Sequence, residues 1–140
     1  MSDEALPEQP PRQTLSFLRH LLRSRGIEAK AKLGQNFLID LNLLDLIVRT
    51  ADLCKADAVL EVGSGTGTLT GRLAEAAGAV VTVEIDDDFF ALVRELMQGQ
   101  PHVRCLHADI LRTKNELNPA VLSAFDEATR QWSCTQRKLV

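Results

Sequence analysis

The sequence has no long hydrophobic run and few cysteines, and both absences narrow the class of protein. No apolar stretch among the 140 residues approaches the roughly 18 residues that a membrane-spanning helix needs. Residues 1–11 are acidic and proline-bearing without an apolar centre, so they do not form a signal peptide. The three cysteines, Cys54, Cys105 and Cys134, are odd in number, widely spaced and without a C-x-x-C pair. We therefore expect no metal site, disulfide framework or membrane partner, and reduced thiols in a cytoplasmic protein, with Cys54 and Cys105 in the core.

Catalytic side-chain constellations are also missing. Nothing resembles a Ser-His-Asp or Cys-His nucleophile system, and no carboxylates form a convincing acid–base pair. His102 and His107 have no cysteine or aspartate at metal-ligand spacing, which favours surface histidines. The length allows one domain, and a composition of 45% hydrophobic and 25% charged residues is typical of a globular protein.

A third absence concerns the glycine-rich segment at residues 59–67, Val-Leu-Glu-Val-Gly-Ser-Gly-Thr-Gly. A dinucleotide fingerprint needs Gly-x-Gly-x-x-Gly, but its third glycine would fall at Thr68. The glycines present are Gly63, Gly65 and Gly67. Glu61 adds an acid at the end of the expected strand, where a polyanion is disfavoured and a zwitterionic tail with a free ammonium is tolerated. S-adenosylmethionine fits this pattern better than NAD or FAD, which stay open as alternatives together with a glycine turn that holds no ligand.

Acids at the ends of the following expected strands support a nucleoside ligand. Glu84 ends the next apolar run, where a carboxylate can accept hydrogen bonds from both ribose hydroxyls; the alternative is a helix-capping acid. Asp86 stands before two further aspartates and Phe89, and we expect it to cap a helix. Asp109 could accept a hydrogen bond from the adenine amine; the alternative is a loop acid or helix cap.

Hydrophobic periodicity predicts alternating helices and strands. After a disordered leader at residues 1–11, we expect helices over 13–24, 41–53, 66–77, 87–98 and 120–132, and strands over 58–62, 79–85, 103–106 and from 138 onward. Alternation of this kind predicts a parallel sheet with right-handed crossovers, whose ligands bind at the carboxyl ends of the strands. Gly63, Glu84 and Asp109 would occupy that position on three successive strands.

Charge is distributed unevenly along the chain. Residues 11–35 contain six basic side chains against the single acid Glu28, whereas the net charge of the whole chain is −3. A basic arm on an acidic body suggests a polyanionic partner, although a solvated amphipathic helix explains the charge equally well. The basic residues are Arg12, Arg19, Arg23, Arg25, Lys30 and Lys32.

Two motifs together resemble one enzyme family. Gly-Gln-Asn-Phe-Leu at 34–38, followed by Glu-Val-Gly-Ser-Gly-Thr-Gly-Thr-Leu-Thr at 61–70, closely resembles the rRNA adenine N6-dimethyltransferase family. The resemblance extends from about Leu15 to Val140. It implies an α/β class I (Rossmann-like) S-adenosylmethionine-dependent methyltransferase fold, with residues 12–140 as a partial domain. It also implies N6-dimethylation of adenines in small-subunit rRNA. We expect the basic arm to reach the rRNA, and the chain, if folded, to be monomeric.

The resemblance implies roles for individual residues. Asn36 and Leu38 would close over S-adenosylmethionine, Gly63 with Gly65 and Gly67 would approach its methionine portion, Glu84 would hold the ribose, and Asp109 would hold the adenine. No catalytic residue is assigned, because the family's Asn-Leu-Pro-Tyr-like motif, which receives the flipped target adenine, does not occur in the sequence.

Because the Asn-Leu-Pro-Tyr-like motif is absent, two hypotheses about the function of the chain remain. The chain is either an rRNA adenine dimethyltransferase or a truncated, non-catalytic fragment that binds S-adenosylmethionine, and possibly RNA, without turnover. A third hypothesis, the same fold acting on a small molecule or protein, is disfavoured by the motif at 34–38 and the basic arm. A sheet truncated after the start of its fourth strand would leave an unpaired edge and uncovered apolar surface, so we expect marginal stability or aggregation.

Overall fold

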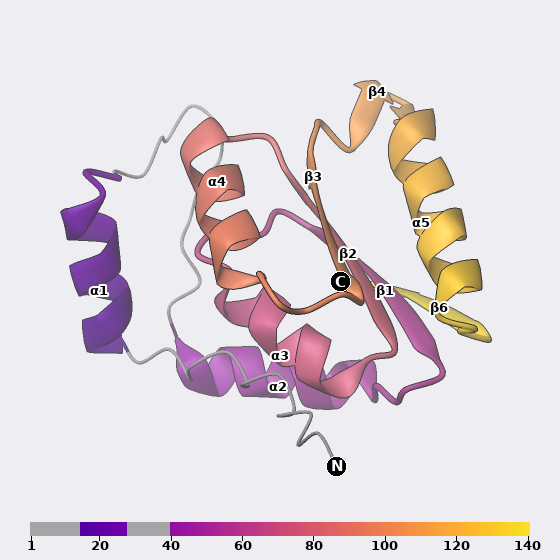
Figure 1. The fold of residues 1–140 in the computed structure, drawn as a ribbon, viewed down its shortest axis with the longest axis horizontal. Helices are drawn as coiled ribbons and strands as arrows, with labels where there is room; N and C mark the ends of the chain where they lie inside the picture. Colours follow the sequence, from indigo (N-terminus) through magenta and orange to yellow (C-terminus); the bar gives the residue numbers. More distant parts are fainter. Residues whose placement is uncertain (1–14, 28–39) are drawn as a thin grey trace, which may run out of the picture.

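The computed structural model describes residues 15–27 and 40–140 and consists of a parallel sheet between two layers of helices (Figure 1). The sheet has the strand order β3-β2-β1-β6. Its strands are β1 (Asp57–Val62), β2 (Ala79–Glu84), β3 (Val103–His107) and β6 (Gln136–Leu139). The helices are α1 (Leu15–Ser24), α2 (Leu41–Ala51), α3 (Thr68–Ala76), α4 (Asp87–Leu96) and α5 (Pro119–Gln131). The predicted parallel α/β fold is therefore confirmed.

Successive side chains of β1 and β2 point to opposite faces of the sheet, so the hydrophobic core lies in two layers. Residues such as Leu60 and Val81 face α5 and pack against its buried stripe, which includes Val121 and Phe125. Residues at the intervening positions face the opposite side, where Val59 packs with partners from α3. Both central strands are buried on both faces, as is usual for a parallel sheet covered by helices.

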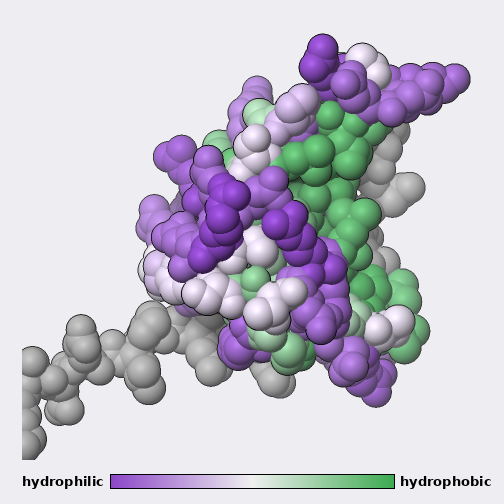
Figure 2. Space-filling view, turned by 90° about the vertical axis from the view of Figure 1, so that its right-hand side faces the viewer, coloured by the Kyte–Doolittle hydropathy of each residue, from purple (hydrophilic) through white to green (hydrophobic). Residues whose placement is uncertain are grey.

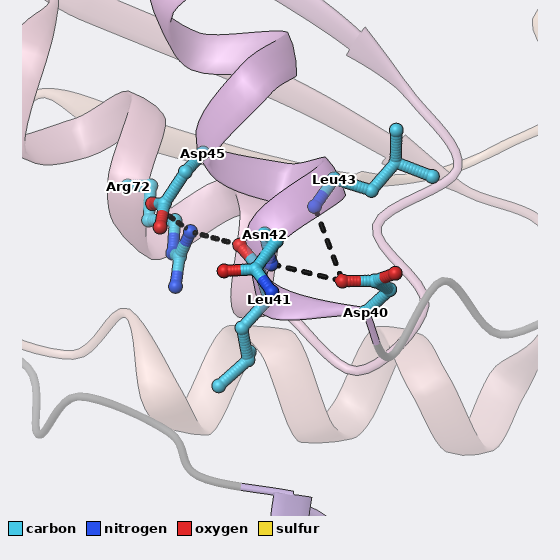
Figure 3. A network of polar contacts seen from close by, with 6 residues as sticks. All are labelled: Asp40, Leu41, Asn42, Leu43, Asp45 and Arg72. Carbon is cyan, nitrogen blue, oxygen red and sulfur yellow. Dashed lines mark hydrogen bonds and ion pairs between the residues drawn. The ribbon is translucent and has the colours of Figure 1, made fainter.

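The start of α2 is held by a network of polar contacts shown in Figure 3. Asp40 caps the helix, because its Oδ1 accepts hydrogen bonds from the backbone N–H groups of Asn42 and Leu43 at 2.9 and 3.2 Å. From α3, the Arg72 guanidinium donates to the Leu41 carbonyl at 3.2 Å and pairs with Asp45. The cap and the cross-link fix α2 against α3 immediately after the segment that contains the predicted residues Asn36 and Leu38.

Two sequence-based expectations about the elements were wrong. Residues 111–117, for which no helix or strand was expected, form an antiparallel hairpin of β4 (Leu111–Thr113) and β5 (Glu116–Leu117). The strands are too short for a period-two pattern to appear. The last strand begins at Gln136 rather than at residue 138 because its pairing with β1 starts at Asp57, where the polar Gln136 lies opposite. The predicted leader lies outside the described residues.

The cysteine prediction was wrong in part. Cys54 is exposed in the turn before β1, and Cys105 on β3 is only partly buried. The apolar run around Cys54 ends in a helix terminus and a turn, which carry it to the surface. Among the described residues, no helix is long and apolar enough to cross a bilayer.

Candidate functional site

The glycine-rich loop joins β1 to α3 and depends on three left-handed backbone conformations. Gly63, Gly65 and Gly67 have φ angles of 85°, 51° and 77°, a region that residues with a side chain adopt only with strain. The Gly63 N–H donates to the Val83 carbonyl at 2.8 Å, which fixes the loop to the end of β2. This geometry explains the Gly-x-Gly-x-Gly spacing without a dinucleotide fingerprint.

The three glycines differ in what surrounds them. A Cβ added at Gly63 or Gly65 would meet no atom of the described residues within 4 Å, so the loop presents bare backbone to that part of the chain at both positions. A Cβ at Gly67 would lie 3.3 Å from Leu96 and 3.4 Å from Val93, both in the α4 segment. Gly63 and Gly65 therefore form the face that a ligand can approach, and Gly67 lets the loop pack against α4.

Glu84 lies at the carboxyl end of β2 and binds the glycine-rich loop directly. Its Oε2 accepts hydrogen bonds from the Gly65 N–H at 3.0 Å and the Ser64 hydroxyl at 3.3 Å, and its Oε1 accepts one from the Asp86 N–H at 3.2 Å. The side chain is buried. A carboxylate offers about four acceptor positions. One therefore remains for a ligand hydroxyl, and the Ser64 hydroxyl must turn away before Glu84 can accept two.

Asp86, not Glu84, caps α4. The Oδ1 of Asp86 accepts hydrogen bonds from the N–H groups of Asp88 and Phe89 at 3.0 and 3.1 Å. The prediction for Asp86 is confirmed, and the capping alternative for Glu84 is removed.

Asp109 is brought beside Glu84 by the pairing of β2 with β3. The Ala108 N–H donates to the Glu84 carbonyl at 3.2 Å, and Asp109 follows in the loop after β3. Its side chain is exposed, and its Oδ1 accepts from the Leu111 N–H at 2.9 Å. Asn118, the cap of α5, donates to the Asp109 carbonyl at 2.9 Å. These hydrogen bonds hold Asp109 in its loop at the carboxyl edge of the sheet. Its hydrogen bond to the adenine of a cofactor stays a prediction.

Glu61 is not at the ligand-facing surface where the sequence placed it. Its side chain is 1% exposed and lies between β1, β2 and the first turn of α3. The hydroxyls of Thr70 and Thr82 donate to its Oε1 at 2.5 and 2.6 Å, and no described residue donates to its Oε2. Burial, opposed in part by these two hydrogen bonds, raises the pKa of Glu61 to about 7. The sequence contained one sign of this buried cluster: a polar residue, Thr82, within an otherwise apolar strand. In the structure Thr82 lies opposite Glu61.

His102 and His107 have structural partners. His107 is exposed, stacks on Phe90 with ring centroids 4.9 Å apart, and lies 2.9 Å from an Asp87 carboxylate oxygen. His102 is half-buried, with its Nε2 2.7 Å from the Ala74 carbonyl, so the expectation of a surface side chain holds only for His107. Within residues 15–27 and 40–140, no cluster of three potential ligands could hold a metal ion.

The basic arm is described only in part. Arg19, Arg23 and Arg25 are exposed on or just after α1, and Arg25 forms an ion pair with Glu95 of α4 at 2.8 Å. Arg12, Lys30 and Lys32 lie outside the described residues, as do Asn36 and Leu38 of the predicted cofactor site.

Taken together, the carboxyl edge of the sheet carries bare glycine backbone beside a buried carboxylate and an exposed one, on three adjacent strands. Glu84, at the end of β2, can accept hydrogen bonds from ligand hydroxyls. The glycine-rich loop lacks the Gly-x-Gly-x-x-Gly spacing of dinucleotide-binding proteins. Fold and site define the chain as an α/β protein of the Rossmann-like methyltransferase class.

Comparison with known proteins identifies the family within this class. The family model described as ribosomal RNA adenine dimethylase matches residues 26–131, and the chain belongs to this family. It is 44% identical over 96 residues to the ribosomal RNA small subunit methyltransferase A of Pelotomaculum thermopropionicum, covering 69% of this chain and 32% of the relative. The protein of the same name from Shouchella clausii is 40% identical over 104 residues, covering 74% and 34%. The chain thus spans about a third of the length of these relatives.

Solved structures with related sequences share the fold. The 23S rRNA methyltransferase ErmE superposes with a TM-score of 0.53 at 29% identity, covering 73% of this chain and 45% of its own. The tRNA (m1A58) methyltransferase TrmI from Aquifex aeolicus superposes with a TM-score of 0.50 at 26% identity, covering 64% and 35%.

Proposed function

We propose that this chain binds S-adenosylmethionine at the carboxyl edge of its sheet, and that it serves N6-dimethylation of adenines in small-subunit rRNA. The observation that carries the proposal is the contact between the Glu84 carboxylate and the Gly65 N–H, because it joins a hydroxyl acceptor to a glycine loop with an open face. The family description, ribosomal RNA adenine dimethylase, suggests the reaction, and the relatives named ribosomal RNA small subunit methyltransferase A suggest the substrate.

The residues fit this cofactor. Gly63 and Gly65 leave room for its methionine portion, Glu84 accepts from its ribose, and Asp109 accepts from its adenine amine. S-adenosylmethionine supplies a methyl group on a sulfonium whose departure as a neutral thioether needs little acid–base help. The protein's contribution is then mainly the orientation of donor and acceptor. Arg19, Arg23 and Arg25 are exposed cations that can contact the phosphates of rRNA.

A second proposal is cofactor binding without turnover. It rests on the site described above, which joins the glycine-rich loop to Glu84 and Asp109, while none of the described residues has an assigned catalytic role. The two proposals are separated by incubating the chain with tritiated S-adenosylmethionine and small-subunit rRNA. Incorporation of label supports the enzyme, whereas binding of S-adenosylhomocysteine without incorporation supports the binding protein.

Glu84→Ala tests the binding site itself. Loss of a charged acceptor for the ribose should cost roughly 1.5–3 kcal/mol of binding free energy, or about 10- to 150-fold in Kd. Isothermal titration calorimetry with S-adenosylhomocysteine measures the change. Glu75→Ala is the matched control, because Glu75 is exposed on α3 and its removal should leave Kd unchanged. Equal affinity of wild type and Glu84→Ala would show that the pocket is elsewhere.

A further inference from the structure

Glu61 is a buried acid that the proposed binding site does not use. It stands two residues before Gly63, and its partner Thr70 stands three residues after Gly67, so its carboxyl group is tied to both ends of the glycine-rich loop. Thr70, in the first turn of α3, and Thr82, on β2, hold its Oε1 from two sides. Oε2 is the one buried side-chain oxygen or nitrogen without a hydrogen-bond partner in the described part of the chain.

The hydrogen bonds indicate which form this acid takes without a ligand. Two hydroxyl donors satisfy one oxygen, as they would the carbonyl oxygen of a neutral acid. A charged Oε2 buried without a donor would be costly. The pKa of about 7 agrees with a group that is protonated at mildly acidic pH and half-protonated near neutrality.

The charged groups of the surrounding elements do not stabilise the ionised form. Glu84 at the end of β2 opposes ionisation of Glu61 by charge repulsion. Cys105, on the neighbouring β3, is a neutral thiol because burial raises its pKa to about 11. The cations of α3, β6 and α4 on this side of the sheet are engaged elsewhere: Arg72 with Asp45, Lys138 with Asp57, and Arg94 over the Phe90 ring. None of the described residues forms an ion pair with Glu61.

We propose that Glu61 is a proton-linked positioning residue, protonated in the ligand-free protein and releasing its proton to solvent when the ammonium of the cofactor's amino-acid tail binds over the glycine-rich loop. The arriving positive charge stabilises the carboxylate beneath it, and the carboxylate attracts the ammonium in return. No bond other than the O–H bond breaks. This inference rests on the proposed cofactor site and assigns a pH-dependence to it.

Coupling between cofactor binding and deprotonation of Glu61 determines how the binding affinity changes with pH. Because binding requires the ionised acid, affinity should rise with pH up to the pKa of the ligand-free protein and then level off. For a free pKa of about 7 that falls well below 6 on binding, S-adenosylhomocysteine should bind about tenfold more tightly at pH 8 than at pH 6. Each binding event should release about 0.9 proton at pH 6 and about 0.1 at pH 8.

Isothermal titration calorimetry in two buffers of different ionisation enthalpy measures both quantities on the whole chain. Glu61→Gln keeps an acceptor for both threonine hydroxyls but cannot release a proton. It should bind S-adenosylhomocysteine more weakly than wild type at both pH values, with the larger loss at pH 8, with little change of affinity between the two, and with no proton release. Thr82→Val removes one donor that favours the carboxylate, and its affinity profile should move to higher pH. Glu75→Gln, an exposed acid on α3, should reproduce the wild-type profile.

Methylthioadenosine, which lacks the amino-acid tail, is the ligand control and should bind without proton release. Proton release by the tailless ligand would refute the role of the ammonium. Binding of S-adenosylhomocysteine with no proton release, or with affinity that falls as pH rises, would overturn this inference but leave the proposed cofactor site standing. Failure of wild type to bind S-adenosylhomocysteine at any pH from 6 to 8 would overturn the proposed site and this inference together.

Discussion

At the scale of single residues, several glycines are required by their backbone conformation or by the lack of space for a side chain. Gly63, Gly65 and Gly67 are required by their left-handed φ angles, and the sequence motif singled them out. Gly78, immediately before β2, belongs to no sequence motif. A Cβ there would lie 2.1 Å from the Lys55 carbonyl oxygen, which is backbone and cannot move aside easily.

Gly78→Ala should therefore destabilise the protein by at least about 2 kcal/mol, because the chain must shift to relieve the overlap. Gly71→Ala should do the opposite. Gly71 lies within α3, and its added Cβ would make an ordinary 3.8 Å contact with the Met97 side chain. Higher helix propensity should stabilise that variant by up to about 1 kcal/mol. Thermal and urea unfolding of both variants measure the two changes, and equal effects would contradict this account.

Glu61 should also make stability depend on pH. Its pKa is about 7 in the folded chain and about 4.5 when unfolded, so its contribution is fully present below pH 4.5 and is lost as pH rises through 7. The loss amounts to about 3 kcal/mol. Glu61→Gln should therefore be more stable than wild type at pH 8 and similar to it at pH 5. Urea unfolding of both proteins at the two pH values measures this, and a difference that does not grow with pH would count against a protonated Glu61.

At the scale of elements, Lys138 adds side-chain contacts to the backbone pairing of β6 with β1. Its ammonium donates to the carbonyls of Ala51 and Asp52 at 2.9 and 2.8 Å, at the carboxyl end of α2, and pairs with Asp57 at 3.2 Å. The Cys54 N–H and Lys138 together hold the pKa of Asp57 below its usual value. One side chain thus joins the edge strand, a helix end and the first residue of β1.

Lys138→Met should destabilise the protein by roughly 1.5–3 kcal/mol, because it leaves the buried Asp57 carboxylate with fewer donors. Arg137→Met is the matched control on the neighbouring residue. The Arg137–Asp126 pair is about half exposed, and its loss should cost under about 1 kcal/mol. Since the Asp57 pKa is lowered, this contribution is present above pH 3.8 and is lost as pH falls through the folded value. Chemical unfolding at pH 7 and pH 3 should show the two variants converging in acid.

The elements show what sequence patterning can and cannot predict. The four parallel strands and the helices between them followed from apolar runs and glycine turns, and their order placed Gly63, Glu84 and Asp109 at one edge. The β4–β5 hairpin was missed because two- and three-residue strands carry no periodic signal. The position of Glu61 was missed because alternation fixes which face a residue occupies but not whether a helix covers that face. Only packing of α3 on β1 and β2 shows that Thr70 reaches it.

At the scale of the whole molecule, one side remains apolar. Figure 2 shows a continuous band of hydrophobic surface on the α5–β6 side, flanked by polar side chains. Large exposed hydrophobic residues of these elements and of the β4–β5 hairpin beside α5 are Leu111, Leu117, Leu122 and Leu139. Leu139, in the edge strand β6, is 72% exposed. An open strand edge beside apolar surface is a site of self-association.

Leu139→Lys should therefore reduce self-association of the isolated chain, because a charge on an edge strand opposes edge-to-edge pairing. Light scattering across a concentration series measures the effect. Leu46→Lys is the control, since Leu46 is 51% exposed on α2, which lies on the other side of the sheet. A monodisperse wild-type chain at high concentration would contradict the expectation of aggregation.

The strand order has a consequence for synthesis of the protein. In the order β3-β2-β1-β6, the first strand to leave the ribosome has the last strand as one of its two neighbours. About 74 residues separate the end of β1 from the start of β6, and at 5–20 residues per second their translation takes roughly 4–15 s. Throughout that interval one edge of β1, a central and largely buried strand, can pair with any other extended segment nearby. The nascent chain is therefore most vulnerable at its centre, and a chaperone that shields β1 during those seconds would raise the yield of folded protein.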